Sequence, residues 1–592
     1  MEKIEKIISD GLLIVLKKSF DIEAKESQLV LQKTKKEFEG SFTLVVFPFL
    51  KEAKMSPEML GEKIGSELIN MVGEIDSYNV VKGFLNLTIS TDYWKQTLND
   101  ISVTKNFGFS AQDSKPAVMV EYSSPNTNKP LHLGHLRNNF LGYSVAEIKK
   151  ANGHEVSKVQ IINDRGIHIC KSMLAWQKFG GGETPESSGI KGDKLVGKYY
   201  VAFDKQYKSE IAELIVQGKD KDYAEKNAPS MLEARDILLK WENKDQEVFA
   251  LWEKMNSWVY KGFEQTYKAM GVDFDKNYYE SETYLLGKQV IMDGLAKGVF
   301  EQQEDGSIWV DLTAEGLDRK ILLRSDGTAV YMTQDIGTAI KRFEDFPGLS
   351  SQIYTVGNEQ DYHFKVLFII LKKLGYSWAD NCHHLSYGMV DLPEGKMKSR
   401  EGTVVDADDL MNEMSLTAKS ITEELGKLDG LENKEELYDV IGLGALKYYL
   451  LKVDPKKRLL FNPAESIDFN GNTGPFIQYT HARIRSLIDK FDQEIPEVDE
   501  SSPCNESELK LIEVIYEFPE TIKNASDSYS PALVANYMYS LVKTFNSFYQ
   551  NSNIMKEEDK GIQGNRMVLV SVTGDLIKRG MALLGITVPE QM

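Results

Sequence analysis

The sequence predicts a multidomain protein that combines α/β domains with an all-α C-terminal part. Short apolar runs rich in β-branched residues, at 118–120 and 156–162, alternate with helical patterns, which is typical of a parallel sheet. From about residue 411 to the end, helical periodicity dominates. A chain of 592 residues is also too long for one hydrophobic core, so at roughly 100 to 200 residues per domain we expect three to five domains.

The composition is that of an ordinary globular protein, with 42% hydrophobic residues. No apolar run approaches the roughly 20 residues that a membrane span needs. The first ten residues contain acidic side chains and helical periodicity, where a signal peptide would have a basic end and an uninterrupted apolar stretch. We therefore expect a cytoplasmic protein without membrane contact.

The cysteines do not predict a disulfide framework or a structural zinc site. Cys170, Cys382 and Cys504 lie far apart, and no C-x-x-C pair occurs. A metal site is conceivable only at Cys382-His383-His384, but neighbouring strand residues point in different directions, so ordinary packing is favoured there. No metal site is predicted.

The net charge of -19 limits the kind of nucleic-acid partner that the chain can bind. Neutralising phosphates needs basic surface, so an acidic protein that binds RNA must concentrate its basic residues in patches. One basic segment, residues 452–458, interrupts the acidic C-terminal half. A solvated loop and a phosphate contact are both open there.

Residues 1–110 form a small α/β domain in this interpretation. Ile4, Ile8 and Leu12 have helical spacing, and alternating patterns predict strands at 41–47 and 83–89. A second helix is expected after Ser56, which is a plausible N-cap. Nothing in this domain looks catalytic.

The next domain begins near residue 111 with a strand, a loop and a helix. The loop holds two prolines and two asparagines, which suits a turn at the carboxyl end of a strand, where open α/β sheets bind ligands. His132 and His135 stand at the start of the helix, where imidazoles can donate to phosphate oxygens, and Gly134 lets the backbone approach closely. A turn with surface histidines is the alternative.

The following strand, 156–162, predicts a parallel pair with a right-handed crossover. A turn signal follows at 163–166. Residues 185–280 are interpreted as an insertion. Its aromatic stripe is read as packing in preference to base stacking; the members are Trp252, Met255, Val259, Phe263 and Tyr267. The sheet is expected to resume at 307–312 and 321–324, with a further strand at 352–356.

A second motif is the basic, glycine-flanked stretch from Gly395 to Thr403. Such a loop can close over a triphosphate and neutralise charge that moves onto pyrophosphate. Together with the histidine pair, it predicts nucleotide chemistry.

These motifs resemble class I aminoacyl-tRNA synthetases. His132-Leu-Gly-His135 resembles their first signature, and residues 395–403 resemble their K-M-S-K-S loop. The run Glu121-Tyr-Ser-Ser-Pro-Asn126, with Lys129 before the histidine pair, resembles the arginyl-tRNA synthetase family in particular. Residues 468–484 are similar to that family's junction into a helical anticodon-binding domain, and the N-terminal domain to the one that the family uses on the corner of tRNA. The resemblance covers nearly the whole chain.

The resemblance implies an arginine pocket. In the family, the residues that match Tyr331 and Asp335 bind the substrate side chain, and here they stand at i and i+4 of one predicted helix. The chemistry agrees, because a guanidinium is a planar fork of donors that needs carboxylates and a flat aromatic wall. A surface carboxylate beside a core tyrosine is the alternative. The candidate arginine-binding residues are Glu121, Ser123, Asn126, Tyr331, Asp335 and Gln360.

The resemblance also implies an ATP site and the catalytic groups. The candidate ATP-binding residues are His132, Gly134, His135, His363, Met389 and Lys396. The candidate catalytic residues are Lys129, His132, His135, Lys396, Lys398, Ser399 and Arg400. The chain departs from the family pattern, since alignment on Met397 puts Ser399 where the second loop lysine belongs. Lys129 resembles the lysine found upstream in members that lack the loop lysine, and we expect it to compensate.

The function implied is that of an arginine-tRNA ligase. Such an enzyme activates L-arginine with ATP and Mg²⁺ to arginyl-adenylate and transfers it to the 3′-terminal adenosine of tRNA(Arg). We expect a monomer without a tightly bound metal. The domains would be 1–110, a Rossmann-like catalytic domain at 111–410, a helical connector at 411–465 and a helical anticodon-binding domain at 466–592. A nucleotidyltransferase that acts without RNA and a non-catalytic RNA-binding paralogue are the alternatives.

Overall fold

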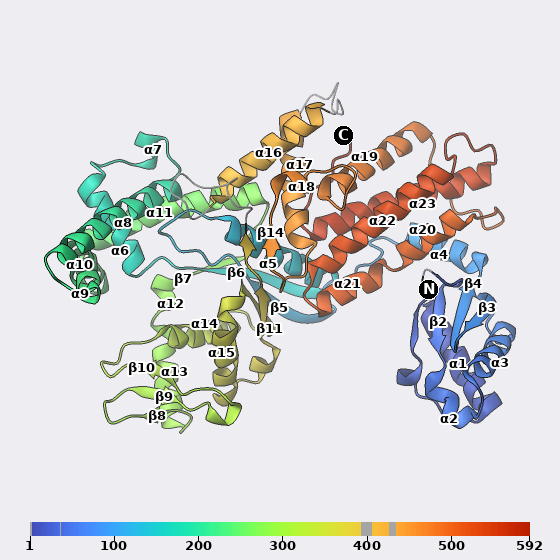
Figure 1. Ribbon diagram of the computed structural model, residues 1–592, viewed down its shortest axis with the longest axis horizontal. Coiled ribbons are helices and arrows are strands. Elements are labelled where there is room, and N and C mark those ends of the chain that lie inside the picture. Colours follow the sequence, from blue (N-terminus) through green and yellow to red (C-terminus); the bar gives the residue numbers. More distant parts are fainter. Residues whose placement is uncertain (1–2, 36, 392–404, 425–433) are drawn as a thin grey trace. The chain divides into compact units, whose positions relative to one another are not determined.

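The computed structural model describes residues 3–35, 37–391, 405–424 and 434–592. They form two compact units. The first unit comprises Met1–Phe107, Arg483–Pro519 and Ser540–Ile577, and the second comprises Gly108–Ala482, Glu520–Tyr539 and Lys578–Met592. The predicted fold class is confirmed, since a parallel-sheet domain is followed by a largely helical C-terminal region (Figure 1).

A five-stranded parallel sheet organises the second unit. Its strands run in the order β12-β11-β5-β6-β7. Their bounds are β5 Lys115–Glu121, β6 His154–Ile162, β7 Lys276–Tyr279, β11 Leu349–Gly357 and β12 His383–Tyr387. The strands predicted at 118–120, 156–162 and 352–356 are confirmed. Val118, Met119 and Val120 are all at most 3% exposed, because both faces of a parallel sheet are covered.

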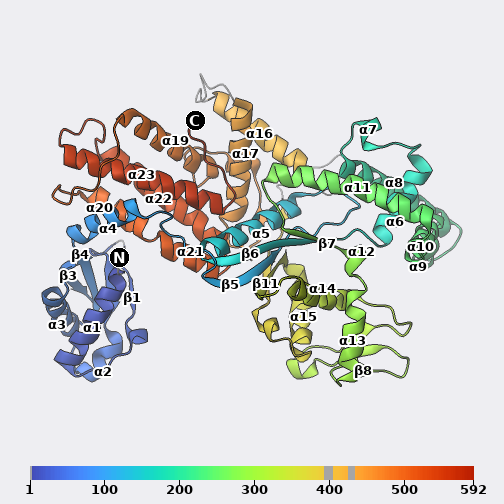
Figure 2. The same cartoon turned by 180° about the vertical axis from the view of Figure 1, so that it is seen from behind.

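Helices cover the two faces of this sheet. Helix α5 (Leu133–Ala151) joins β5 to β6, and α15 (Asp361–Lys373) joins β11 to β12. These crossovers run in opposite directions along the sheet, so α5 lies on one face and α15, with α14 (Tyr331–Asp345), on the other (Figures 1 and 2). The strand order therefore reverses between β5 and β11, which is where open α/β sheets bind their ligands.

The segment between β6 and β7 is helical. It contains α6 Ile167–Phe179, α7 Pro185–Ser188, α8 Gly192–Val216, α9 Lys221–Asn227, α10 Pro229–Glu242 and α11 Gln246–Met270. In the aromatic stripe of α11, Met255, Val259, Phe263 and Tyr267 are buried, so the packing interpretation is confirmed. β7 falls inside the segment predicted as an insertion, although it pairs with β6 in the main sheet, and the short helix α12 (Glu280–Thr283) begins where that segment ends.

The prediction that the main sheet resumes at 307–312 and 321–324 is wrong. Strands do form there, as β9 (Ile308–Val310) and β10 (Lys320–Leu323), but with β8 (Glu301–Gln302) they make a separate antiparallel sheet. The connection between β9 and β10 is too short for a parallel crossover. This small sheet packs against α13 (Leu286–Ala296) and α14.

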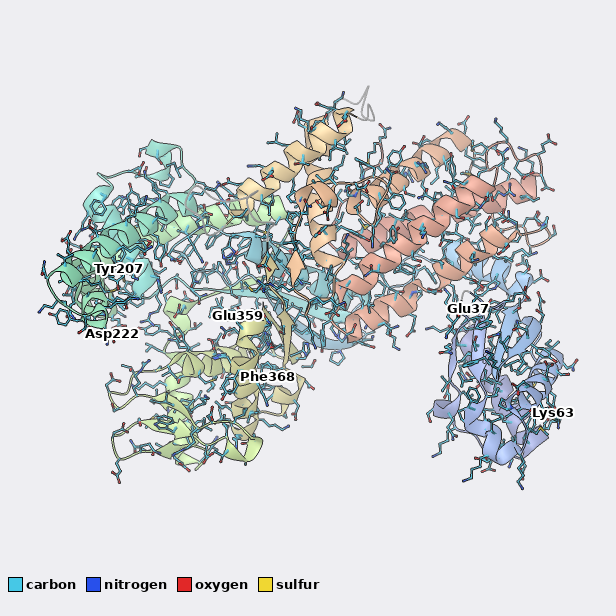
Figure 3. All side chains as sticks on the ribbon, viewed as in Figure 1. Glu37, Lys63, Tyr207, Asp222, Glu359 and Phe368 are labelled. Carbon is cyan, nitrogen blue, oxygen red and sulfur yellow. The ribbon has the colours of Figure 1, made fainter. Side chains whose placement is uncertain are left out.

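The N-terminal part of the first unit is an antiparallel sheet with helices. The strands have the order β1-β2-β4-β3, with bounds β1 Leu31–Lys33, β2 Phe42–Val45, β3 Ile75–Val81 and β4 Phe84–Ile89. The longer helices are α1 Ile4–Phe20, α3 Pro57–Met71 and α4 Thr91–Val103. Ser56 caps α3 by accepting the Met59 N–H at 3.3 Å, as predicted. The Nζ of Lys63 in α3, a residue labelled in Figure 3, lies 4.9 Å from the centroid of the Phe20 ring.

The C-terminal region is helical, as predicted. Its helices are α16 Ala407–Glu424, α17 Lys434–Leu451, α18 Pro463–Ser466, α19 Gly474–Phe491, α20 Glu506–Tyr516, α21 Phe518–Asp527, α22 Pro531–Asn551 and α23 Lys560–Leu583. In the described parts of the chain, no helix combines the length and the apolar character needed to cross a bilayer.

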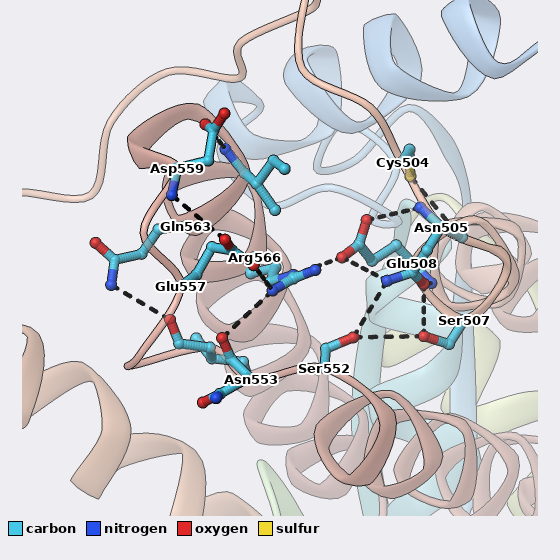
Figure 4. A network of polar contacts seen from close by, with 12 residues as sticks. Cys504, Asn505, Ser507, Glu508, Ser552, Asn553, Glu557, Asp559, Gln563 and Arg566 are labelled. Atoms are coloured by element: carbon cyan, nitrogen blue, oxygen red, sulfur yellow. Dashed lines mark hydrogen bonds and ion pairs between the residues drawn. The ribbon is translucent and has the colours of Figure 1, made fainter.

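A buried arginine joins α20 to α23 inside the first unit (Figure 4). The Nε of Arg566 donates to Glu508 at 2.6 Å, and its Nη1 donates to Glu557 at 2.6 Å and to the Asn553 carbonyl at 3.3 Å. Glu508 also closes a capping box with Asn505 at the start of α20. Glu508 is 3% exposed, so Arg566 supplies the positive charge that compensates its buried carboxylate.

We predict that Arg566→Met loosens α20. Breaking a buried pair leaves a buried carboxylate without compensation, which costs about 3 kcal/mol, so amide hydrogen exchange in α20 should speed up on the order of hundredfold. The matched control is Lys510→Met, because Lys510 makes an exposed pair with Glu506 on the same helix, worth about 0.5 kcal/mol at most. Equal exchange rates in the two variants would contradict the structural role given to Arg566.

Candidate active site

The two histidines of the first motif form a fixed pair at the start of α5. His132 is the N-cap, and its Nδ1 accepts the Gly134 N–H at 3.1 Å. The Nδ1 of His135 accepts the His132 N–H at 3.2 Å, and the two ring centroids are 4.0 Å apart. Because both Nδ1 atoms accept, each ring proton lies on Nε2. Each ring therefore has an Nε2–H donor available beside the N-terminus of a helix.

The surroundings keep both histidines neutral. Burial, with a smaller contribution from Lys129, lowers the pKa of His132 to about 4. Burial also lowers the pKa of His135 well below its usual value, with His132 and Lys129 adding to the effect. Both rings are thus hydrogen-bond donors without charge near pH 7. The positive charge of this cluster comes from Lys129, whose own pKa is lowered by burial.

The turn after β5 is strained. Ser123 and Ser124 have φ values of 71° and 47°, in the left-handed region that non-glycine residues rarely adopt. Asn138 of α5 holds the turn, since its Oδ1 accepts the Ser123 N–H at 2.5 Å and its Nδ2 donates to the Thr355 carbonyl at 2.7 Å. Asn138 was missed in the sequence. A polar residue on the buried side of a helix is the signal that could have found it.

The rest of the turn pairs with the end of β6. The Thr127 N–H donates to the Asn163 carbonyl at 3.1 Å, and the Asn163 N–H donates to the Pro125 carbonyl at 2.9 Å. Asn126, between them, is exposed. The start of the turn 163–166 therefore lies beside the loop that leads from β5 to the histidine pair.

Of the predicted arginine-pocket residues, Tyr331 and Asp335 lie one turn apart on α14. Tyr331 begins α14 and is 77% exposed. One turn later, the Oδ2 of Asp335 lies 2.6 Å from the Nε2 of His363 on α15. Gln360 ends the short helix η4 (Asn358–Gln360) just before α15, next to Glu359, which is labelled in Figure 3. Asp335 is half exposed and thus open to a cation.

Glu121, the other predicted pocket carboxylate, has a different environment. It is the last residue of β5 and is 6% exposed. Its Oε2 accepts from Nη1 of Arg342, a residue of α14 that is 1% exposed, and its Oε1 accepts from the Ser124 hydroxyl at 3.1 Å. Both oxygens of Glu121 are therefore bound by the protein itself.

A third carboxylate at this edge of the sheet was missed in the sequence. Glu280 begins α12, directly after β7. Burial raises its pKa to about 7; Arg165 opposes this rise, while Asp164 and Asp335 add to it. The electrostatic influence of Asp335 places Glu280 on the acidic side of the site. Assigning β7 to the sheet would have revealed it, because strand ends meet at the same edge.

Other predicted residues lie apart from this cluster or outside the described residues. Lys396, Lys398, Ser399 and Arg400 belong to 392–404, which the structure does not describe. The segment that follows them is hydrogen-bonded to residues 131–133, beside the histidine pair. The Leu133 N–H donates to the Val405 carbonyl at 3.0 Å, and the Ala407 N–H donates to the Leu131 carbonyl at 2.9 Å. Met389 is 49% exposed, and its carbonyl accepts the Leu459 N–H.

The side chains of Cys382, His383 and His384 have separate partners. The His383 ring stacks on Tyr529 with 4.0 Å between centroids, and the Nε2 of His384 lies 3.0 Å from the Val356 carbonyl. Over the residues that the structure describes, no group of three or more His, Cys, Asp or Glu side chains is arranged to hold a metal ion. In the basic segment 452–458, the carbonyls of Pro455 and Lys457 accept from Arg137 of α5.

Comparison with known protein families agrees with this geometry. Residues 97–462 match the family model described as the catalytic domain of class I (R) tRNA synthetases, and residues 477–592 match that of the DALR anticodon binding domain. With the histidine pair at the switch point of a parallel sheet, the first match defines the class as that of the class I aminoacyl-tRNA synthetases.

Curated relatives narrow the class to one family. The chain is 58% identical to an arginine-tRNA ligase of Flavobacterium psychrophilum and 56% identical to one of Bacteroides fragilis, each over the full length of both chains. The chain belongs to the arginyl-tRNA synthetases, a family of class I ligases. Two solved structures share its fold over their full length: the arginyl-tRNA synthetases of Thermus thermophilus (24% identity, TM-score 0.80) and Plasmodium falciparum (20% identity, TM-score 0.78).

We predict that His132 titrates near pH 4 and not near 6.5. Lys129→Met should raise this pKa, because a nearby positive charge disfavours the imidazolium, but the pKa should stay below 6.5, since burial is the larger cause. The folded-state pKa is depressed, so the stability linked to His132 is present above about pH 6.5 and is lost as the pH falls toward 4. The measurement is NMR titration of the ring signal that disappears in His132→Gln. A midpoint above 6 in the unmodified chain would contradict the assignment.

Proposed function

We propose that the chain ligates L-arginine to tRNA(Arg) at the expense of ATP, and that the residues at the switch point between β5 and β11 perform the chemistry. One observation carries this proposal. Two neutral imidazole donors at the N-terminus of α5 and an open carboxylate on α14 belong to helices on opposite faces of one sheet. A phosphate site and a guanidinium site can thus flank the same strand ends.

The reaction has two steps. The arginine carboxylate attacks the α-phosphorus of ATP in line, so a new P–O bond forms while the bond to the bridging oxygen breaks and pyrophosphate leaves. The 2′-hydroxyl of the terminal adenosine of tRNA then attacks the activated carbonyl and releases AMP. Neither step needs a covalent enzyme intermediate. Positioning and neutralisation of phosphate charge supply most of the rate.

The phosphates bind at the start of α5. The Nε2–H groups of His132 and His135 donate to phosphate oxygens, and Gly134 keeps the backbone close. Lys129 supplies positive charge, together with Lys396, Lys398 and Arg400 of the loop, while Ser399 offers a hydroxyl donor. These groups suit anions and not a cation, so Mg²⁺ enters as part of the ATP substrate, where it neutralises phosphate charge. Met389 contributes to the adenosine side.

The substrate guanidinium binds at Asp335, with Tyr331 as the aromatic wall. Tyr331 is largely exposed, so it can lie against a bound side chain. Gln360, Asn126 and Ser123 surround the remaining part of the amino acid. Because Glu121 is paired with Arg342 and burial raises the pKa of Glu280 to about 7, Asp335 supplies most of the negative charge that the guanidinium needs. His363, expected near adenosine, contacts Asp335, and we place it where the amino acid and the nucleotide meet.

The remaining parts of the chain bind tRNA. The region 466–592 holds the anticodon, and the domain 1–110 contacts the corner of tRNA. Residues 111–410 form the catalytic domain and 411–465 its helical connector. The enzyme acts as a cytoplasmic monomer.

We predict that Asp335→Asn raises the KM for arginine on the order of hundredfold and that for ATP less than threefold. The neutral amide loses the charged hydrogen bonds to the guanidinium but leaves the phosphate site intact. The assay is aminoacylation of total tRNA, in which the unmodified chain should charge arginine alone among the twenty amino acids. Asp318→Asn is the control, because that carboxylate is exposed on the small antiparallel part. Equal losses for both substrates would mean that the pocket is misassigned.

We predict that Lys129→Met slows adenylate formation about hundredfold at saturating substrates. If Lys129 replaces the missing loop lysine, its loss removes a charge that stabilises the transition state. The measurement is single-turnover aminoacylation with tRNA present. The control is Lys171→Met, since Lys171 of α6 lies over the Phe203 ring. A change of less than threefold in Lys129→Met would show that the loop alone suffices.

A further inference from the structure

Glu121 and Arg342 form a buried ion pair at the edge of the sheet. Glu121 ends the central strand β5 and Arg342 lies near the end of α14. The guanidinium lies between two aromatic rings, 5.1 Å from the centroid of Tyr278 and 5.9 Å from that of Tyr354. Burial opposes the charge of Arg342, but Glu121, with Tyr354 and Tyr278 adding to its effect, outweighs burial and raises the pKa of Arg342 above its usual value. Arg342 is therefore a buried guanidinium that keeps its charge.

Stability alone explains this pair poorly. Taking two charges out of water is costly, and a buried pair is often no more stable than apolar residues of the same volume. The cost is not fully recovered here, because Nε and Nη2 of Arg342 have no hydrogen-bond partner among the described residues. What the pair does provide is a fixed geometry between a helix and a strand.

The face of α14 that holds Arg342 also holds the proposed arginine pocket. Tyr331, Asp335 and Arg342 are separated by four and seven residues, so at 100° per residue they project within about 40° of one another. Arg342 lies about 10 Å from Asp335 along the helix, at 1.5 Å per residue. The pair thus joins the inner end of this face to the last residue of β5. The strained turn at Ser123 and Ser124 follows directly.

We propose that Arg342 is a positioning residue for arginine recognition. Through its ion pair with Glu121, Arg342 fixes the position of α14 along the sheet, and therefore the positions of Tyr331 and Asp335. The same ion pair fixes the start of the strained turn. The inference rests on the proposed pocket at Asp335. Since a displacement of about 1 Å can cost hundredfold in rate, the buried ion pair that ties α14 to the end of β5 can set the position of Asp335.

The test is Arg342→Lys, which keeps the positive charge but replaces the planar guanidinium with an ammonium group. We expect the KM for arginine to rise at least tenfold and that for ATP to change less than twofold. The preference for arginine over homoarginine should fall at least fivefold, because a displaced Asp335 changes the depth of the pocket. A merely structural defect would lower the active fraction, and hence kcat, with every substrate alike. The matched control is Lys341→Gln, which removes a half-exposed ion pair with Asp345 from the same helix.

Each outcome decides the proposal. An unchanged KM for arginine, or equal changes for arginine and ATP, in soluble Arg342→Lys overturns it. If that variant does not fold, Ser124→Ala removes the other hydrogen bond to Glu121 and should raise the KM for arginine about threefold, and no change there overturns the proposal as well. Asp335→Asn is measured in parallel. If Asp335→Asn leaves the KM for arginine unchanged, the pocket itself fails. If only Arg342→Lys has no effect, the pocket stands and the positioning role fails.

Discussion

The reversal of strand order between β5 and β11 is the constraint on which the rest of this active site depends. Right-handed crossovers force α5 and α15 onto opposite faces of the sheet, so the two strands leave an opening at their carboxyl ends. The histidine pair begins the helix on one side, and Tyr331 and Asp335 begin the helix on the other. The helices that carry the proposed phosphate and guanidinium sites thereby meet at neighbouring strand ends, although His132 and Asp335 are about 200 positions apart in the chain.

Local sequence patterns predicted the individual elements well. The apolar run before Glu121, the helical spacing after His132 and the N-cap at Ser56 each depend on a few neighbouring residues, and each occurs in the structure. It was harder to predict which strands pair with one another, because pairing depends on the length and direction of the segments that connect the strands. Strands β9 and β10 were correctly located, but the main sheet was the wrong partner, and β7 was hidden at the end of a helical insertion.

The same distinction applies to the candidate site. His132, Gly134, Lys129, Tyr331 and Asp335 could be nominated from recognisable motifs, and their roles stay predictions. Glu280 could not, since its relevance arises only when β7 joins the sheet and brings it near Asp335. Asn138 was likewise invisible, because its role is to hold a backbone turn whose positive φ angles no pattern of side chains reveals. Residues that position others therefore require the structure.

The charge distribution follows from the need to bind nucleotide and tRNA with an acidic protein. A chain with a net charge of -19 repels phosphate in general, so phosphate must be attracted locally. In the proposed function, neutral imidazole N–H groups at a helix N-terminus attract phosphate through directional hydrogen bonds and the helix dipole, without adding exposed positive charge. Lys129, whose pKa is lowered by burial, supplies the positive charge of this cluster. On the other face of the sheet, Glu121 is paired with the buried Arg342 while Asp335 is half exposed, so the carboxylate proposed for the substrate guanidinium is the more accessible of the two. The proposed sites thus rely on placed donors and acceptors more than on net charge.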